Sequence, residues 1–360
     1  MWRKIGNIFA VLLGCGVIIA YICYASYLAK GDRKDCRVKE LHISIANDSE
    51  LHKFASEEYI REQLKESNIA IEDCRIDSVD AVGISEFLVQ NGFVASANAY
   101  VTYSGNVYVE LTQHRPLLRL MSGGMNHYVT KEGIVFHSPQ KGSYYAPVVT
   151  GAYKPLFPPT YEGRIDAYYE LLYADEDLKM AELNKEIGSV MRERKKSNAQ
   201  KSEYKKDCKR GIFESKSRFE QRKMGLGLKI KGCEQEIATF DVKIAQLEEQ
   251  KRLINKRKKK LQKSYDDFMN LINFVSLVEE SEFWSSEVVQ FVTNTTSLGE
   301  IDITLIPRSG NFVIEFGTLA EQKTKLTRLN NFYNSCFSRV EEQQYKRIDV
   351  RYDKQVICTK

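Results

Sequence analysis

The sequence predicts an α+β protein with one N-terminal transmembrane helix, two regions of mixed strands and helices, and a long antiparallel coiled-coil hairpin that interrupts the second region. Three observations support this prediction. Residues 5–29 are almost entirely apolar or small and contain no charged residue. On both sides of residues 166–278, apolar and polar side chains alternate over short segments, as in strands. Within 166–278, apolar residues recur every three or four positions, as in coiled coils.

The N-terminal segment 5–29 fits an uncleaved membrane anchor better than a signal peptide. A span needs about 20 apolar residues, whereas the apolar region of a signal peptide has roughly 7–15. Ala25-Ser26-Tyr27 is a poor cleavage site. The charge rule does not decide the orientation, because basic residues stand on both sides of the segment: Arg3, Lys4, Lys30, Arg33, Lys34 and Arg37.

The net charge of +5 is local, because residues 252–263 supply much of it. Basic runs without interleaved aromatic residues are typical of solvated helix faces, so we expect no nucleic-acid partner.

The first folded region, residues 37–114, has the order strand, helix, helix, strand, strand. The expected segments are 41–45, a helix that begins after Ser56, 78–90, 93–103 and 106–114. In the second helix we expect Val82, Phe87 and Leu88 to face inward. Gly105 supplies the turn between the last two strands.

The second region is divided into residues 115–165 and 279–360. The expected strands are 117–121, 127–130, 134–137, 147–150, 288–292, 300–306 and 311–316, followed by a helix over 319–337. Two final strands meet at Asp353-Lys354.

The hairpin, residues 166–278, has an apolar seam in its later half. Its positions are Ile230, Cys233, Ile237, Phe240, Ile244, Leu247, Ile254, Leu261, Tyr265, Phe268, Ile272 and Val275, with Lys251 and Lys258 as polar interruptions. In the earlier half the seam is interrupted by Arg194, Ser197 and Lys201. Gly211, Gly225 and Gly227 are candidate positions for the reversal.

Cys208 and Cys233 both fall on seam positions. Two interpretations stay open: a disulfide that staples the hairpin in an oxidising compartment, or two small apolar seam residues. No C-x-x-C pair is present, which argues against a zinc ribbon or a thioredoxin-like site.

No motif in the sequence indicates catalysis. The five histidines lack metal-site spacing, and neither a G-x-S-x-G elbow nor a phosphate-binding loop occurs. Gly225-Leu226-Gly227 lacks the third glycine of a dinucleotide site. We therefore expect a protein without enzymatic activity, cofactor or metal.

Four segments outside the hairpin resemble the cell-division protein family FtsQ/DivIB, in particular its Bacteroidetes-type members. They are LVQNGFVASANAYVTYSGNVYV at 88–109, VELTQHRPLLRLMSGGMNHYVTKEGIVFH at 109–137, Phe283-Trp284 with GEIDITLIPRSGNFVIEFG at 299–317, and LTRLNNFYNSC at 326–336 with RIDVRYDKQVICTK at 347–360. Their order after a single membrane anchor makes the resemblance specific.

The resemblance implies a cytoplasmic N-terminus at 1–4, a transmembrane helix at 5–29, a POTRA domain (βααββ) at 37–114, and a β domain formed by 115–165 and 279–360. It implies a single-pass inner-membrane scaffold at the division septum whose C-terminal part is periplasmic. Family members bind FtsB, in complex with FtsL, through an edge strand that the partner extends.

On this resemblance the edge is the final strand, 355–359, and the expected contact residues are Arg351, Tyr352, Gln355, Val356 and Ile357. Core packing is the competing explanation for Val356 and for Cys358.

Family members usually lack a coiled coil, so residues 175–265 look like an insertion, either with an unknown partner or simply tolerated. Two other classes of protein share some of these features. A membrane-fusion-type periplasmic adaptor of a secretion or efflux system also has a helical hairpin, but lipoyl-like glycine-rich segments flank it. A POTRA chaperone of outer-membrane assembly usually has several POTRA units.

Overall fold

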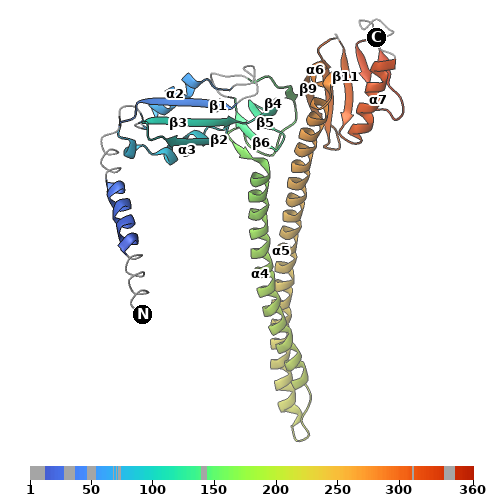
Figure 1. Cartoon of the computed structure of the whole chain (residues 1–360). Helices are drawn as coiled ribbons and strands as arrows, with labels where there is room; N and C mark the ends of the chain where they lie inside the picture. The colour runs from blue at the N-terminus through green and yellow to red at the C-terminus, as the bar shows by residue number, and fades with distance from the viewer. Residues whose placement is uncertain are drawn as a thin grey trace, which may run out of the picture. The chain divides into compact units, whose positions relative to one another are not determined.

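The structure of the 360-residue chain is a computed structural model (Figure 1). It describes residues 13–27, 37–46, 54–67, 69, 71, 74–138, 144–309, 312–335 and 345–360. The chain divides into two compact units. One comprises residues 1–153, 159–163 and 272–360, and the other comprises residues 154–158 and 164–271. Each unit is described by itself.

Residues 13–27 form a helix whose side chains are all exposed. The predicted membrane span, 5–29, lies partly outside the described residues, which leave out 1–12 and 28–36. Over the described part of the chain, no helix combines the length and the apolar character that a bilayer crossing requires.

The region predicted at 37–114 has the expected βααββ order. Its elements are β1 (Glu40–Ala46), α2 (Glu57–Glu66), a short 3₁₀ helix (Ile76–Ser78), α3 (Ala81–Val89), β2 (Val94–Val101) and β3 (Asn106–Gln113). In the sheet β3 is central, parallel to β1 and antiparallel to β2. The turn between β2 and β3 contains Gly105 at φ 94°, a conformation that glycine adopts without strain.

Side-chain caps set the helix starts of this region. The Ser56 hydroxyl accepts a hydrogen bond from the Tyr59 N–H at 3.2 Å, and the Asp80 carboxylate accepts one from the Gly83 N–H at 2.8 Å. Because α3 starts at Ala81, Ile84 and Leu88 share its buried face. The inward orientation predicted for Val82 is wrong, since this residue lies on the opposite side and is 67% exposed.

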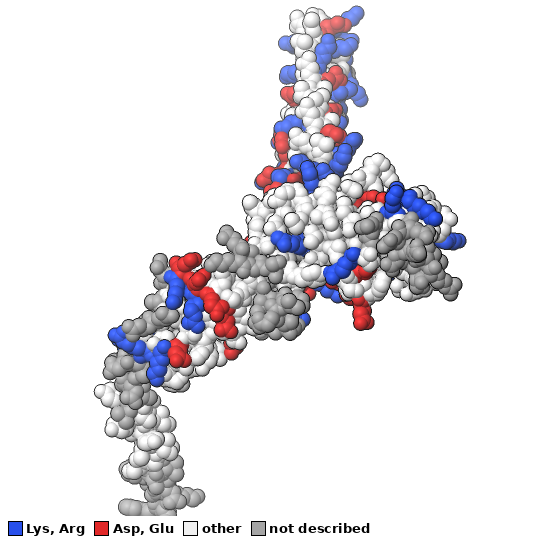
Figure 2. All heavy atoms as spheres, turned by 90° about the horizontal axis from the view of Figure 1, so that it is seen from above, with Lys and Arg blue, Asp and Glu red and all other residues white. Residues whose placement is uncertain are grey.

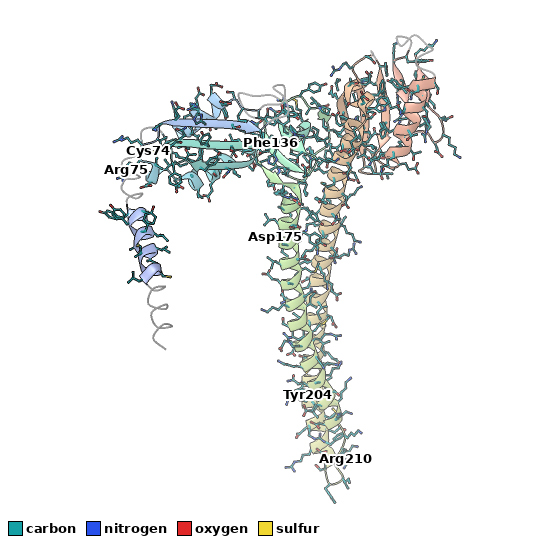
Figure 3. All side chains as sticks on the ribbon, viewed as in Figure 1. Cys74, Arg75, Phe136, Asp175, Tyr204 and Arg210 are labelled. Atoms are coloured by element: carbon teal, nitrogen blue, oxygen red, sulfur yellow. The ribbon has the colours of Figure 1, made fainter. Side chains whose placement is uncertain are left out.

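One buried ring extends the core of this region into the next. Phe54 is 1% exposed, and its ring centroid lies 4.9 Å from that of Tyr128 on β5 and 5.4 Å from that of Phe136 on β6. Phe54 also stacks on Tyr144 at 5.3 Å. Figure 3 labels Phe136 at the β-domain side of this cluster. The βααββ region and the β domain therefore share one hydrophobic cluster.

Over the described residues, the β domain is one ten-stranded sheet with the order β13-β12-β11-β10-β9-β7-β4-β5-β6-β8. Its strands are β4 (Pro116–Ser122), β5 (His127–Thr130), β6 (Ile134–His137), β7 (Val148–Gly151), β8 (Gly163–Arg164), β9 (Val288–Thr295), β10 (Ile301–Pro307), β11 (Val313–Thr318), β12 (Arg347–Asp349) and β13 (Ile357–Thr359). All the predicted strands are present, with ends that shift by a few residues.

The two halves of this sheet meet where β7 pairs in parallel with β9. The Ala152 N–H donates to the Thr293 carbonyl at 2.7 Å, and the Thr293 hydroxyl donates to the Thr150 carbonyl at 2.6 Å. These bonds join segments that the hairpin separates in the sequence.

Two short helical elements support the second half of the sheet. The Ser281 hydroxyl caps α6 (Glu282–Glu287) by accepting from the Trp284 N–H at 3.4 Å. Trp284 is 1% exposed and packs edge-on against Tyr333 of α7 (Gln322–Ser335), with ring centroids 4.9 Å apart.

The hairpin consists of α4 (Ile165–Asp207) and α5 (Lys216–Glu279). Cross-helix ion pairs show that the helices are antiparallel, because Asp177 pairs with Lys258, whereas Lys201 pairs with Glu234 at 2.9 Å. Every predicted seam position of α5 is buried or half-buried. The spacing of three and four therefore identified the inner stripe of α5 correctly.

The polar interruptions of the seam have partners on the facing helix. The Lys251 ammonium donates to the Asn184 side-chain oxygen at 2.8 Å, and the Lys258 ammonium lies 4.0 Å from the ring centroid of Tyr173. On α4, Arg194 pairs with Asp241 at 2.6 Å, and the Ser197 hydroxyl donates to Glu236 at 2.9 Å. These pairs fix the register of the helices, because a slip along the seam leaves the polar groups without partners.

The chain reverses between Asp207 and Lys216, in a segment that contains Gly211. Gly225 and Gly227 lie inside α5 and take no part in the turn.

Cys208 and Cys233 are free thiols in the structure. Lys201, the residue opposite Glu234, lies about two helical turns before Cys208, a displacement of ~10 Å. A disulfide requires Cα atoms within about 7 Å. The helical register therefore argues against the disulfide and favours the interpretation as small seam residues, of which Cys233 is buried and Cys208 half-buried.

Candidate functional site

The C-terminal strand β13 lies at one end of the ten-stranded sheet. Its neighbour β12 pairs antiparallel with β13 and parallel with β11. Within the part of the chain that the structure describes, β13 pairs with one strand only. Among the described residues, one side of β13 therefore has no neighbouring strand.

The five predicted contact residues fall on the segment that connects β12 to β13 and on the start of β13. Arg351, Tyr352 and Gln355 are exposed and precede the strand, and Val356 is half-buried. Ile357 is the first residue of β13 and is 39% exposed. The strand is shorter than the predicted 355–359, because the connecting segment, with Lys354 at φ 59°, occupies the first positions.

The Arg351 guanidinium is occupied by contacts within the chain. Its Nε donates to Asp349 Oδ1 at 3.0 Å, its Nη2 donates to Asp349 Oδ2 at 2.5 Å, and its Nη1 lies 3.6 Å from Glu315. Burial by itself raises the pKa of Asp349, but the hydrogen bonds from the Arg351 side chain and backbone outweigh burial and lower it. Arg351 therefore holds the connecting segment against β11 and β12.

Gly317, the penultimate residue of β11, makes room for this arginine. It has φ 79°, and a Cβ atom at this position would lie 2.6 Å from Cγ of Arg351. Only glycine satisfies both the backbone conformation and the close approach.

Arg328 of α7 fixes the same segment from the other side. Its side chain is 16% exposed, and its Nη1 donates to the Val350 carbonyl at 3.2 Å and to the Tyr352 carbonyl. Its Nη2 lies 3.5 Å from Asp353. Arg328, Gly317 and Asp349 were not predicted as site residues. No local spacing relates Arg328 or Gly317 to residues 350–353, whereas Asp349 lies only two residues before its partner Arg351.

We expect Asp349→Asn to destabilise the β domain by about 2 kcal/mol, because hydrogen bonds from a charged partner to a buried group are lost. Urea unfolding followed by the fluorescence of Trp284 measures this change. Because the folded pKa of Asp349 lies below its unfolded value, the stabilisation is present above about pH 4 and is lost as the pH falls through the folded pKa.

Asp353→Asn is the matched control. The Asp353 side chain is 79% exposed and makes one contact of 3.5 Å with Arg328, so the expected cost is below about 0.5 kcal/mol. Equal costs for the two variants at neutral pH would show that the Asp349 network does not hold the edge.

Two family models match the chain. A model described as a POTRA-like domain matches residues 36–112, and a model described as FtsQ/DivIB, C-terminal related, matches residues 242–359. Comparison with curated proteins finds no match. The second model begins inside α5, so the matched domain includes the later part of the range that we expected to be an insertion, 175–265.

The two matched ranges contain most of the strands described above. The POTRA-like match covers β1 to β3, and the C-terminal match contains β9 to β13 together with α7. Both are families of non-catalytic scaffold domains. The open edge at β13 and the residues that brace it therefore lie inside the second matched domain.

Proposed function

Because the chain belongs to the FtsQ/DivIB family, we propose that it is a scaffold of the bacterial division machinery that binds FtsB, in complex with FtsL, through the β13 edge. The observation that carries this proposal is the position of β13 at the end of the sheet, with one described neighbour. A partner strand can add there by backbone hydrogen bonds.

In this proposal, side chains beside the edge determine which partner binds. Tyr352 is 47% exposed, and Ile357 is 39% exposed. Apolar and aromatic groups of this kind are typical anchors of protein interfaces. Arg351 and Arg328 act as positioning residues in this proposal, because their guanidinium groups are held by groups of the chain itself. Because these contacts already hold the segment before β13 in place, binding of a partner strand loses little conformational entropy there.

We also propose that residues 5–29 anchor the chain in the inner membrane as a single-pass type II segment, with the C-terminal part in the periplasm at the division septum. The support is the uncharged composition of this range and the helix at 13–27, whose apolar side chains are exposed on all sides. Such a helix needs an apolar environment to be stable. From this position the scaffold would recruit septal proteins.

Two proline substitutions test the edge. Successive residues of a strand direct their N–H groups to opposite sides, so one of Ile357→Pro and Cys358→Pro removes a donor to β12 and the other removes an outward donor. We expect the outward substitution to weaken binding of the FtsB–FtsL complex by at least about tenfold, equivalent to 1.4 kcal/mol, with the fold unchanged. The measurement uses the full chain in detergent and biolayer interferometry.

Tyr352→Ala tests the side-chain contribution without altering the backbone and should weaken the same binding several-fold. Circular dichroism and Trp284 fluorescence report whether each variant keeps its fold. If both proline variants are folded and bind as the unmodified chain does, β13 is not the binding edge. If the unmodified chain does not bind FtsB–FtsL, the scaffold assignment itself loses its support.

A further inference from the structure

The tip of the hairpin exposes two apolar side chains completely. Ile212 is 96% exposed and Phe213 is 102% exposed, in the turn between α4 and α5. Single exposed apolar residues are common at protein surfaces, but two adjacent large residues that are both almost fully exposed are unusual. Figure 3 labels Arg210 in this turn, at the end of the hairpin.

A network of ion pairs and hydrogen bonds holds the turn in this form. Arg222 of α5 pairs with Glu214 at 2.6 Å and donates to the Asp207 carbonyl and, at 3.1 Å, to the Lys209 carbonyl. Hydrogen bonds from Arg222 lower the pKa of Glu214 to about 2. The Arg210 guanidinium adds a bond to the Glu214 carbonyl at 2.8 Å. These bonds hold the turn in a conformation in which Ile212 and Phe213 are exposed.

The surroundings of the apolar pair are basic. Residues 205–218 contain six lysines or arginines and two acidic residues, and one of the acidic residues is the paired Glu214. The basic residues are all exposed: Lys205, Lys206, Lys209, Arg210, Lys216 and Arg218. A second basic run, residues 252–263 of α5, has seven lysines or arginines and no acidic residue, but Arg252, Arg257 and Lys258 pair there with Glu249, Glu176 and Asp177. On the face drawn in Figure 2, Lys and Arg of the hairpin lie beside Asp and Glu.

We propose that this tip docks on a lipid bilayer that contains anionic lipids. Binding to a bilayer surface has two contributions, the insertion of apolar groups and the attraction of basic residues to anionic headgroups. The tip offers both, because its exposed apolar pair lies among exposed basic residues. A protein partner fits less well, because specific interfaces bury about 800 Å² on each side, and a convex turn with two apolar residues offers little area. A bilayer surface accepts such a turn without a complementary pocket.

The length of α4 determines how far the tip lies from the base of the hairpin. α4 has 43 residues, which corresponds to a length of ~65 Å. The tip can therefore contact a bilayer at a distance from the base of the hairpin. The inference does not depend on the partner proposed for β13, because it uses no residue of that edge.

The test uses the full chain in nanodiscs of neutral phosphatidylcholine, mixed with separate vesicles of phosphatidylcholine alone or with one-third phosphatidylglycerol. Flotation measures vesicle binding. The variant Phe213→Trp reports insertion by a blue shift of its emission, after subtraction of the signal of the unmodified chain. A second arm uses nanodiscs that themselves contain phosphatidylglycerol and detects a tip that folds back on its own bilayer.

We expect binding to the anionic vesicles and a blue shift in at least one of the two arms. The double variant Ile212→Ser with Phe213→Ser should weaken this binding at least tenfold. The matched control is Leu171→Ser with Leu178→Ser, which changes two residues of α4 that are each 68% exposed and should leave binding unchanged. Replacement of Lys205, Lys206 and Lys216 by Gln should weaken binding most at low salt.

Absence of binding and of any shift in both arms would overturn the proposal. So would equal binding by the tip double variant and the control, or equal binding to neutral and anionic vesicles. Circular dichroism of each variant shows whether the helices are intact. FtsB–FtsL binding, which we expect to be unchanged by the tip variants, separates failure of this inference from failure of the edge proposal.

Discussion

Gly151→Ala is expected to destabilise the β domain by at least about 3 kcal/mol, one of the largest effects of any single substitution in this chain. Gly151 is the last residue of β7 and has φ 110°. A Cβ atom there would lie 2.0 Å from the carbonyl oxygen of Thr293 and 2.8 Å from its backbone nitrogen. The contact is with backbone atoms of β9, so only separation of the two strands relieves it.

Separation of β7 from β9 has a consequence beyond local strain. The hydrogen bonds from Ala152 and Thr293 that join the halves of the sheet are adjacent to Gly151. Their loss exposes unsatisfied backbone groups, which adds to the steric cost. We expect a lower urea midpoint for the transition that Trp284 reports, because Trp284 lies in the second half of the domain.

Gly124→Ala is the matched control for this prediction. Gly124 has φ 83°, and a Cβ atom there meets nothing within 4 Å. The expected loss of stability is therefore only that of placing an alanine at a positive φ, about 1–2 kcal/mol. Similar costs for the two variants would mean that the approach of β9 to Gly151 contributes nothing to stability.

Phe54→Ala is expected to cost about 3–5 kcal/mol, the range for removal of a buried aromatic ring. Phe54 has contacts with Phe93 of the POTRA-like region and with Tyr128, Phe136 and Tyr144 of the β domain. The substitution leaves a cavity in the shared cluster. We therefore expect reduced cooperativity between the two regions as well as lower stability.

Differential scanning calorimetry of the full chain measures both effects. The variant should show a lower Tm and a transition that broadens or splits, since the regions no longer share a filled core. Phe213→Ala removes the same ring from a fully exposed position and should leave Tm unchanged. A Phe54→Ala transition that is unchanged in midpoint and width would contradict a shared core.

The sequence by itself identified the secondary structure well, because the strongest signals are local. The spacing of three and four over Ile230–Val275 predicted the buried stripe of α5, and alternation predicted the strands on both sides of the hairpin. Ser56 marked the start of α2. The error concerns a detail that depends on helix phase, the orientation of Val82.

The segment before β13 is held by contacts between residues that lie far apart in the sequence. The resemblance placed Arg351 among the contact residues, which stays a prediction, and within the chain its guanidinium binds Asp349 and Glu315. Arg328, which braces the same segment, is about 20 residues earlier in the chain and carries no local signal. Contacts across such separations depend on how α7 and β11 pack, which is a property of the folded sheet and helices together.

Composition and periodicity thus determined the elements of this chain, their order and the apolar N-terminal segment, because these follow from each residue and its near neighbours. Only the tertiary structure decided that β7 joins β9 across the hairpin, that Gly317 leaves room for Arg351, and that Arg328 holds the segment before β13. The physical reason is that strand pairing and close backbone approach are long-range events. Their free energy comes from groups that have no neighbour relation until the chain has folded.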